Sequence, residues 1–306
     1  MSPANLQRLN GLPADFTWPN GARLALSIVV NVEEGAEMNI RDGDPGPEPV
    51  DELSAAPRKP IRMHGSESNY QYGIKAAAPR IWHALDAHRM PVTVTAASLA
   101  LERAPELAQA IVARGDEICC HGYRWVHQFR MDEAPERQFI RKGWQSIEQT
   151  TGTRPQGWLS RYMHTDATQR LLLEEGYSYH MDDYSDDLPF WQHVEMADGS
   201  QRPLLMLPYA MDSNDMKMWI APSYTPRDWA QYAIDSFDWL RAESQQVPRM
   251  MSFGLHLRIV GRPGRMGAFQ SFLDHVARAG DVWVATRAQI ADAYRAAVPT
   301  PQETSR

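Results

Sequence analysis

The sequence contains little cysteine: only Cys119 and Cys120 occur among its 306 residues, and they are adjacent. Adjacent residues of a strand point to opposite faces of a sheet and rarely form a disulfide with each other. We therefore expect both thiols to be buried and reduced, as is typical of cytoplasmic proteins. The N-terminus lacks the apolar region of a signal peptide, and no apolar run approaches the roughly 20 residues that span a bilayer. A cytoplasmic protein with no membrane partner is expected.

Positive charge is also scarce, because 31 lysines and arginines face 38 aspartates and glutamates, a formal net charge of −7. No basic block offsets this balance, so nothing in the charge favours nucleic acid or an anionic membrane as a partner. Three common site motifs are missing too. The chain has no Gly-x-Ser-x-Gly elbow and no Gly-x-Gly-x-x-Gly, and the turn at 261–264 lacks the Gly-Lys-Ser/Thr end of a phosphate loop.

What the sequence does contain is a regular alternation of short apolar runs with helical periodicity. Strands are expected at 23–31, 92–95, 117–120, 157–159, 177–180, 204–207, 250–255 and 282–285, and helices at 70–85, 104–114, 134–149, 167–175, 227–241, 267–279 and 286–297. Such alternation predicts one mostly parallel sheet, open or closed. We divide the chain into an N-terminal arm (1–22), a single α/β domain (23–298) with a long loop at 35–68, and a tail (299–306). A loop of that length is usually functional, so we expect it to cover the site or to contact a second subunit.

Polar side chains follow several of these strands directly. Glu33 and Glu34 follow the first strand and His121 the third. Asp183 follows the strand at 177–180, and His256 the strand at 250–255. Ligands of α/β proteins bind beyond the carboxyl ends of the strands, and a barrel brings all those ends to one face. The convergence therefore favours an α/β barrel. The two carboxylates suit metal ligation or general-base work, and a histidine suits acid–base chemistry near neutral pH. The alternative is that the glutamates begin a solvated loop and the histidines are structural.

A metal site at His121 would want a second histidine or cysteine about four residues later. That position holds Trp125, so the sequence predicts a site with few or no metal ligands. The acidic segment 182–187, with Asp183, is flanked by aromatic residues, which argues against a purely solvated loop. Trp125, Trp158 and Trp191 lie near strand ends, where they would line a pocket or belong to the core.

Six segments together resemble the polysaccharide deacetylase superfamily (carbohydrate esterase family 4), and within it the branch of allantoinases and cyclic-imide hydrolases. These segments are 31–35, 121–125, 151–158, 183–191, 207–216 and 254–265. The resemblance implies a distorted (β/α) barrel of about seven strands, of the NodB-like type. By position, Glu33 falls on the superfamily's base and Glu34 on its metal aspartate. His121 falls on the first zinc histidine, Trp125 replaces the second, and His256 falls on the catalytic histidine.

The resemblance to this branch, with Trp125 in place of the second zinc histidine, implies a hydrolase of a non-peptide C–N bond that works without a metal. Its substrate would be a small cyclic amide, imide or ureide. If a metal binds after all, Glu34 and His121 would be ligands, with zinc or another divalent ion as the cofactor. Tyr162-Met163-His164 replaces a stretch rich in Gly, Thr and Ser in allantoinases, so a different ring is expected. The candidate site residues are Glu33, Glu34, His121 and His256 for catalysis, and Arg124, Trp125, Trp158, Arg161, Asp183 and Trp191 for substrate binding.

The expected mechanism has water attack a carbonyl, with Glu33 or Glu34 as general base. His256 would protonate the leaving nitrogen, and His121 with Arg161 or Arg124 would stabilise the oxyanion. Two other functions stay open: a metal-dependent N-deacetylase of a sugar, and an inactive barrel that binds a small molecule. The long loop and the related enzymes also imply a homo-oligomer, such as a tetramer.

Overall fold

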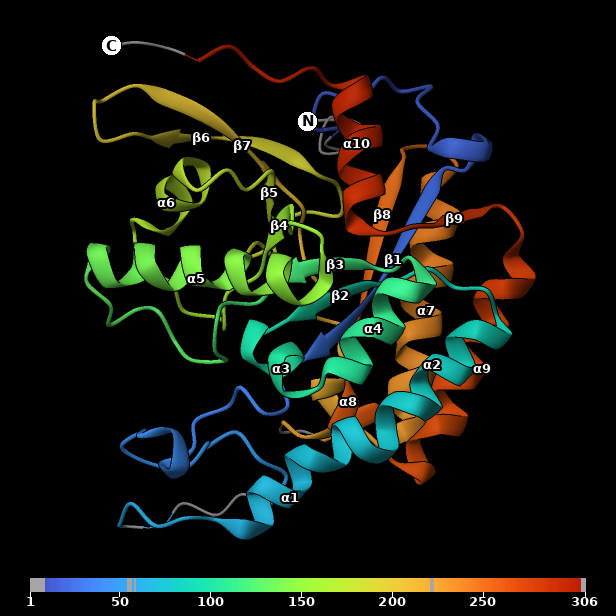
Figure 1. The fold of residues 1–306 in the computed structure, drawn as a ribbon. Coiled ribbons are helices and arrows are strands. Elements are labelled where there is room, and N and C mark those ends of the chain that lie inside the picture. The colour runs from blue at the N-terminus through green and yellow to red at the C-terminus, as the bar shows by residue number, and fades with distance from the viewer. Residues whose placement is uncertain (1–8, 54–56, 58, 221–222, 304–306) are drawn as a thin grey trace.

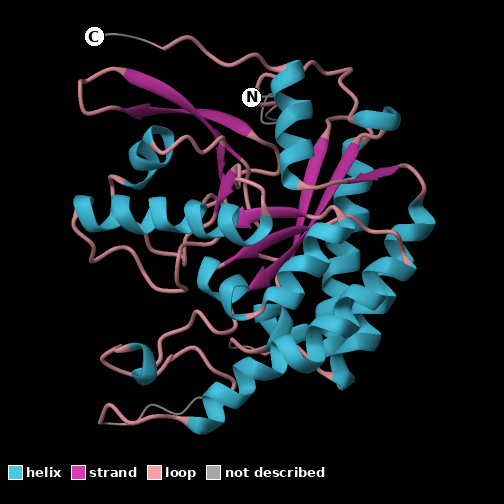
Figure 2. Ribbon diagram, viewed as in Figure 1, coloured by secondary structure: helices cyan, strands magenta, loops and turns pink. Residues whose placement is uncertain are grey.

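The computed structural model describes residues 9–53, 57, 59–220 and 223–303. Its strands form one sheet (Figures 1 and 2): β1 (Leu24–Val32), β2 (Thr93–Ala96), β3 (Glu117–Cys120), β4 (Gly157–Trp158), β5 (Tyr179–His180), β6 (Phe190–Glu195), β7 (Gln201–Met206), β8 (Arg249–His256) and β9 (Val282–Val284). The α-helices are α1 (His64–Tyr72), α2 (Ala78–Ala87), α3 (Ser98–Arg103), α4 (Pro105–Arg114), α5 (Glu133–Thr151), α6 (Thr168–Glu174), α7 (Pro226–Ser244), α8 (Leu257–Val260), α9 (Pro263–Ala279) and α10 (Arg287–Ala297). Short 3₁₀ helices η2 (Pro19–Gly21), η3 (Ile40–Asp42) and η5 (Asp215–Met218) lie in connections.

The sheet runs in the order β6-β7-β5-β4-β3-β2-β1-β8, and its pairs are parallel except for β6 with β7. β1 is central and completely buried, which explains its continuous apolar run. One edge of β1 pairs with β8, while its other edge pairs with β9 at 24–26 and with β2 at 29–32. Helices flank the sheet (Figure 2), and the main hydrophobic core contains side chains of both strands and helices.

The sheet curls, so that loops following β5 and β7, near its other edge, form hydrogen bonds with β8. The backbone N–H of Met250 donates to Asp187 O at 2.8 Å, and that of Gly254 donates to Ser213 O at 3.1 Å. The predicted distorted (β/α) barrel is therefore confirmed. Its sheet holds nine described strands rather than about seven, mainly because β6 and β7 form an antiparallel hairpin that the sequence analysis placed partly in a loop. Most side chains of β6 are half-buried or exposed, so this edge strand lacks a clear apolar pattern.

The helix expected from residue 70 begins earlier, at His64, so the long loop ends at residue 63. Between α1 and α2 the segment η4 (Gly73–Ala77) is π-helical. A β-carbon on Gly73 would lie 2.5 Å from Glu34 Oε1, so any other residue there would displace the Glu34 side chain. Single-turn π segments are frequent at functional sites, and this one packs against the predicted acidic pair.

Two further expectations concern the cysteines and membrane-spanning segments. Cys119 and Cys120 are both buried and free, as the sequence analysis predicted. Among the described residues, no helix has the length and the apolar character that crossing a bilayer would require.

Candidate active site

The carboxyl ends of β1, β3, β4 and β8 surround one small cavity with a water-accessible volume of about 30 Å³. This volume holds only a water molecule or two, so a larger ligand requires the lining side chains to move apart. Loops after β5 and β7 complete its wall. The cavity is lined by Asn31, Glu33, His121, Trp125, Leu159, Ser160, Arg161, Tyr162, Tyr184, Tyr209, Asn214 and His256.

Glu33 lies at the centre of this cavity with only 1% of its surface exposed. Its Oε1 atom is 3.4 Å from His121 Nε2 and 3.4 Å from His256 Nε2. Its Oε2 atom accepts a hydrogen bond from Arg258 Nη1 at 2.7 Å. Burial alone would raise the pKa of Glu33, but Arg258, His256 and His121 outweigh it and hold the pKa well below its usual range. Glu33 is therefore a carboxylate at neutral pH.

His256 is oriented by Asp215, the first residue of η5. Its Nδ1–H donates to Asp215 Oδ1 at 2.7 Å, which turns Nε2 toward Glu33. The other oxygen, Oδ2, accepts the backbone N–H groups of His256 at 2.8 Å and Val260 at 3.2 Å. Burial would lower the pKa of His256, but the charges of Glu33 and Asp215 raise it to about 9. At neutral pH the ring is an imidazolium that can give up a proton from Nε2.

The ring of His121, like that of His256, is held with Nε2 toward Glu33, but by a different partner. Its Nδ1–H donates to the backbone oxygen of Leu159 at 2.7 Å, so its Nε2 also faces Glu33. The carbonyl belongs to the residue directly after β4, the sheet neighbour of β3. The structure therefore brings Glu33, His121 and His256 together, as the sequence analysis predicted for the carboxyl ends of these strands.

Glu34 lies behind the cavity rather than in it. Its Oε2 accepts the backbone N–H of Glu33 at 3.1 Å, and its Oε1 accepts the backbone N–H of Arg258 at 3.1 Å. The carboxyl group packs against Gly73 of the π-helical segment. Burial and the neighbouring charge of Glu33 raise the pKa of Glu34, although Arg258 opposes the rise. The geometry therefore makes Glu33, and not Glu34, the carboxylate that faces a ligand.

Arg258 was not recognised from the sequence. It follows His256 by two residues, and the single turn of α8 buries its side chain completely. The guanidinium lies over the rings of Tyr70 (4.4 Å) and Trp125 (5.1 Å), measured to the ring centroids. Its Nη1 is 2.7 Å from Glu33 and 3.5 Å from Glu34. This one cation therefore balances the acidic pair, because a buried carboxylate needs such a partner.

These residues do not fit the zinc site of the superfamily. The position of the second zinc histidine holds Trp125, whose ring lies 3.7 Å from the guanidinium carbon of Arg161. Both carboxylates already bind Arg258, and an ion between them would meet its charge at close range. Glu34 directs its oxygens to backbone N–H groups and not toward His121. The alternative ligand pair of Glu34 and His121 is therefore not assembled at this cavity.

Of the predicted substrate-binding residues, Trp125 and Arg161 do line the cavity. Arg161 is not a free cation, however. It forms a two-point ion pair with Glu48 of the long loop, with Nη1 at 2.8 Å from Oε2 and Nη2 at 2.5 Å from Oε1. Its Nη1 also donates to the backbone oxygen of Trp125 at 2.8 Å. The arginine thus fixes the long loop against the cavity wall and is a poor candidate for stabilising an oxyanion.

Arg124 and Trp158 lie outside the cavity. Arg124 forms an ion pair with Asp44 of the long loop at 2.6 Å. Trp158 is completely buried, and its Nε1–H donates to Ser160 Oγ at 2.8 Å. Its ring belongs to the main core. Successive side chains of β4 and the loop after it alternate between two faces, and the ring of Trp158 is on the face away from the cavity.

Asp183 and Trp191 are also turned away from the cavity. The Oδ1 atom of Asp183 accepts the backbone N–H of Ser185 at 2.8 Å and its hydroxyl at 2.7 Å, a local turn. Trp191 belongs to the hairpin strand β6 and donates to the backbone oxygen of Val298 at 3.2 Å. The acidic, aromatic segment contributes Tyr184 to the cavity instead.

Tyr209 is a cavity residue to which the sequence analysis gave no role. Its hydroxyl oxygen accepts hydrogen bonds from Asn31 Nδ2 at 2.8 Å and Asn214 Nδ2 at 3.5 Å. Burial raises its pKa, so the hydroxyl stays protonated. No acceptor for its hydrogen is seen among the described residues, which leaves that hydrogen available to a ligand. In the sequence, Tyr209 belongs to the segment 207–216. That segment contributed to the family resemblance but did not single out this residue.

Comparisons with known proteins agree with this fold. Residues 68–179 match a family model described as Polysaccharide deacetylase. A Schizosaccharomyces pombe protein described as "Putative polysaccharide deacetylase" is 33% identical over 308 residues, which cover 94% of this chain and 96% of that protein. The crystal structure of PuuE allantoinase has a TM-score of 0.89 and 38% identity, and covers 97% of this chain and 99% of that one. A probable polysaccharide deacetylase from Pseudomonas aeruginosa PAO1 has a TM-score of 0.88 and 37% identity, over 97% of this chain and all (100%) of the other.

Proposed function

The chain belongs to the polysaccharide deacetylase family, and on this premise we propose that it hydrolyses a ring C–N bond of a small cyclic amide, imide or ureide. Its relatives are hydrolases that act on non-peptide C–N bonds. The observation that supports a ring substrate is the cavity itself. Four aromatic side chains line a cavity this small, and with modest movement of those side chains it suits one small planar ring better than a sugar chain. The similarity to an allantoinase points in the same direction.

In the proposed mechanism, water attacks the ring carbonyl and Glu33 accepts the proton that the water loses. Arg258 keeps Glu33 ionised and fixes its orientation. The ring C–N bond breaks when His256 passes its Nε2 proton to the leaving nitrogen. General acid–base steps of this kind contribute roughly 10²–10⁴-fold each.

The negative charge that develops on the carbonyl oxygen needs a donor in the same cavity. We assign this part to the hydroxyl of Tyr209, held by Asn31 and Asn214. Arg161 and Arg124, the donors expected from the sequence, are already paired with Glu48 and Asp44. Donors fixed in advance are usually the largest contribution to such catalysis. The mechanism requires no metal step.

The deciding experiment is an activity screen before and after treatment with a chelator. The substrates are allantoin, hydantoin, succinimide and dihydrouracil, beside oligomers of N-acetylglucosamine. We expect ring opening of at least one cyclic substrate to persist after chelation. Release of acetate from the sugar oligomers, lost with chelator and restored by zinc, would instead establish the metal-dependent N-deacetylase that the names of two relatives favour. Binding of a ring in a thermal-shift assay without turnover would indicate an inactive binding barrel.

We also propose that the protein is cytoplasmic and forms a homo-oligomer, with a tetramer as the expected size. Light scattering coupled to gel filtration tests the oligomer directly. A mass of one chain, 34.7 kDa, would contradict it.

A further inference from the structure

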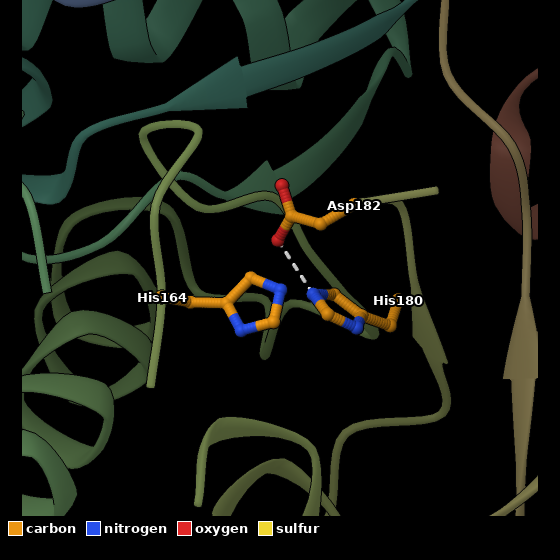
Figure 3. A group of neighbouring side chains, drawn as sticks. All are labelled: His164, His180 and Asp182. Carbon is orange, nitrogen blue, oxygen red and sulfur yellow. Dashed lines mark hydrogen bonds and ion pairs between the residues drawn. The ribbon is translucent and has the colours of Figure 1, made fainter. Parts of the chain in front are cut away.

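A second group of chemically active side chains lies beside the cavity wall and takes no part in the mechanism above. His164 belongs to the loop after β4, while His180 ends β5 and Asp182 follows it by two residues. One ligand atom from each lies within 4.8 Å of the other two, and no other such group of three or more is found among the described residues. Figure 3 shows the three side chains turned toward one another.

The hydrogen bonds around the group prepare it for a metal ion. His164 Nδ1–H donates to the backbone oxygen of Thr165 at 3.0 Å, which leaves the lone pair of Nε2 facing the other two side chains. A backbone carbonyl on the second ring nitrogen is the usual support of a metal-bound histidine. Asp182 Oδ2 accepts the backbone N–H of Ser160 at 2.8 Å and lies 2.5 Å from His180 Nε2.

The burial of the group adds an independent observation. His180 has none of its surface exposed, and the side chain of Asp182 is 2% exposed. His180 Nδ1 and Asp182 Oδ1 have no hydrogen-bond partner among the described residues. Buried polar atoms are usually satisfied, so these two unpaired atoms leave the histidine and the carboxylate able to take up a further partner.

We propose that His164, His180 and Asp182 bind one divalent cation of the zinc type. Two imidazoles and one carboxylate form a common ligand set for zinc, with bonds of about 2.0–2.2 Å. Ligand atoms at such distances are roughly 3–3.5 Å apart in a tetrahedral site, so a shift of about 1 Å completes the site. His164 is only half-buried, which leaves a path for the ion and a fourth position for water. Binding replaces the proton between His180 and Asp182 with the metal.

This site is separate from the Glu33 centre but shares a wall with it. Ser160 lines the substrate cavity, and its N–H is bound to Asp182. Between Ser160 and His164, Tyr162 has a φ of 54°, a left-handed conformation that is rare for residues other than glycine. A metal on His164 would hold this strained segment, and the ring of Tyr162, in place at the cavity. The expected role is therefore structural support of the cavity wall and not catalysis.

Zinc alone is the probe for the test. The purified chain is stripped with chelator and titrated with zinc sulfate by calorimetry, and its metal content is then measured by elemental analysis. We expect one zinc per chain, a higher midpoint of thermal unfolding, and at least tenfold weaker binding in His164→Gln and in Asp182→Asn. His193→Gln is the matched control, because His193 is exposed on β6 and lies outside the group.

Two results would overturn the proposal. One is a wild-type chain that binds no stoichiometric zinc, or binds it no more tightly than His164→Gln. The other is zinc binding that is abolished by Glu33→Gln and unaffected by His164→Gln, which would place the ion in the substrate cavity. Because every readout is binding or stability, the test is independent of which substrate the enzyme uses. Cobalt substitution adds a check, since a tetrahedral site with histidine ligands gives visible absorption bands that the Asp182→Asn variant would lose.

Discussion

The raised pKa of His256 depends on Asp215, and Asp215→Asn tests this link. A rise from 6.5 to about 9 corresponds to about 3 kcal/mol of preference for the charged ring, because one pKa unit is about 1.4 kcal/mol. In the variant, the amide oxygen can accept the two backbone N–H groups that Oδ2 accepts now. The amide NH₂ then faces the imidazole and favours its neutral form. We expect the pKa of His256 to fall by roughly 1–3 units, the usual effect of one adjacent charge.

The assay needs no substrate. Nuclear magnetic resonance of a histidine-labelled sample follows the ten imidazoles through a pH titration, and His256→Gln identifies the signal. Asp238→Asn is the matched control, because Asp238 pairs with His275 at the same distance of 2.7 Å but on the surface. A wild-type His256 that titrates near 6.5, or one that is unchanged in Asp215→Asn, would refute the reasoning.

The raised pKa of His256 also makes stability and activity depend on pH. Since the folded-state pKa is above the unfolded value, the stabilisation from a charged His256 is fully present below pH 6.5 and is lost as pH rises through about 9. Turnover should fall in parallel above about pH 9, by tenfold per pH unit, because the general acid loses its proton. In Asp215→Asn this basic limb should move to lower pH.

Four further substitutions test the roles of single residues. Glu33→Gln should fold normally and lose at least about 10²-fold in turnover, whereas Glu34→Gln should affect stability more than the pH profile; equal losses of turnover in the two would contradict the assignment of Glu33 as the base. Gly73→Ala should lower the free energy of unfolding by about 1–3 kcal/mol, because its β-carbon displaces the Glu34 carboxylate, and chemical denaturation measures this change. Tyr209→Phe should lower kcat by roughly 10²-fold with KM little changed; unaltered kcat would exclude its hydroxyl as the oxyanion donor.

Much of the fold could be predicted because the informative patterns are local. The apolar run of β1 and the helical periodicity of α2, α4 and α7 each depend on a few neighbouring residues. The hairpin β6–β7 could not be predicted, because an edge strand with one partner has no buried face to impose alternation. The start of α1 was missed for a related reason: its first turn is polar and lies on the surface beside the long loop.

The sequence by itself determined that Glu33, His121 and His256 would meet, because each directly follows a parallel strand and those strands end at one edge of a curled sheet. It also determined that the second zinc histidine is missing. Only the tertiary structure decided that Glu33 faces the cavity while Glu34 packs against Gly73. It alone gave the remote partners, such as Glu48, which lies 113 residues before Arg161 and neutralises it. The physical reason is that the residue type fixes the charge and length of a side chain, whereas tertiary packing determines which remote residue it contacts.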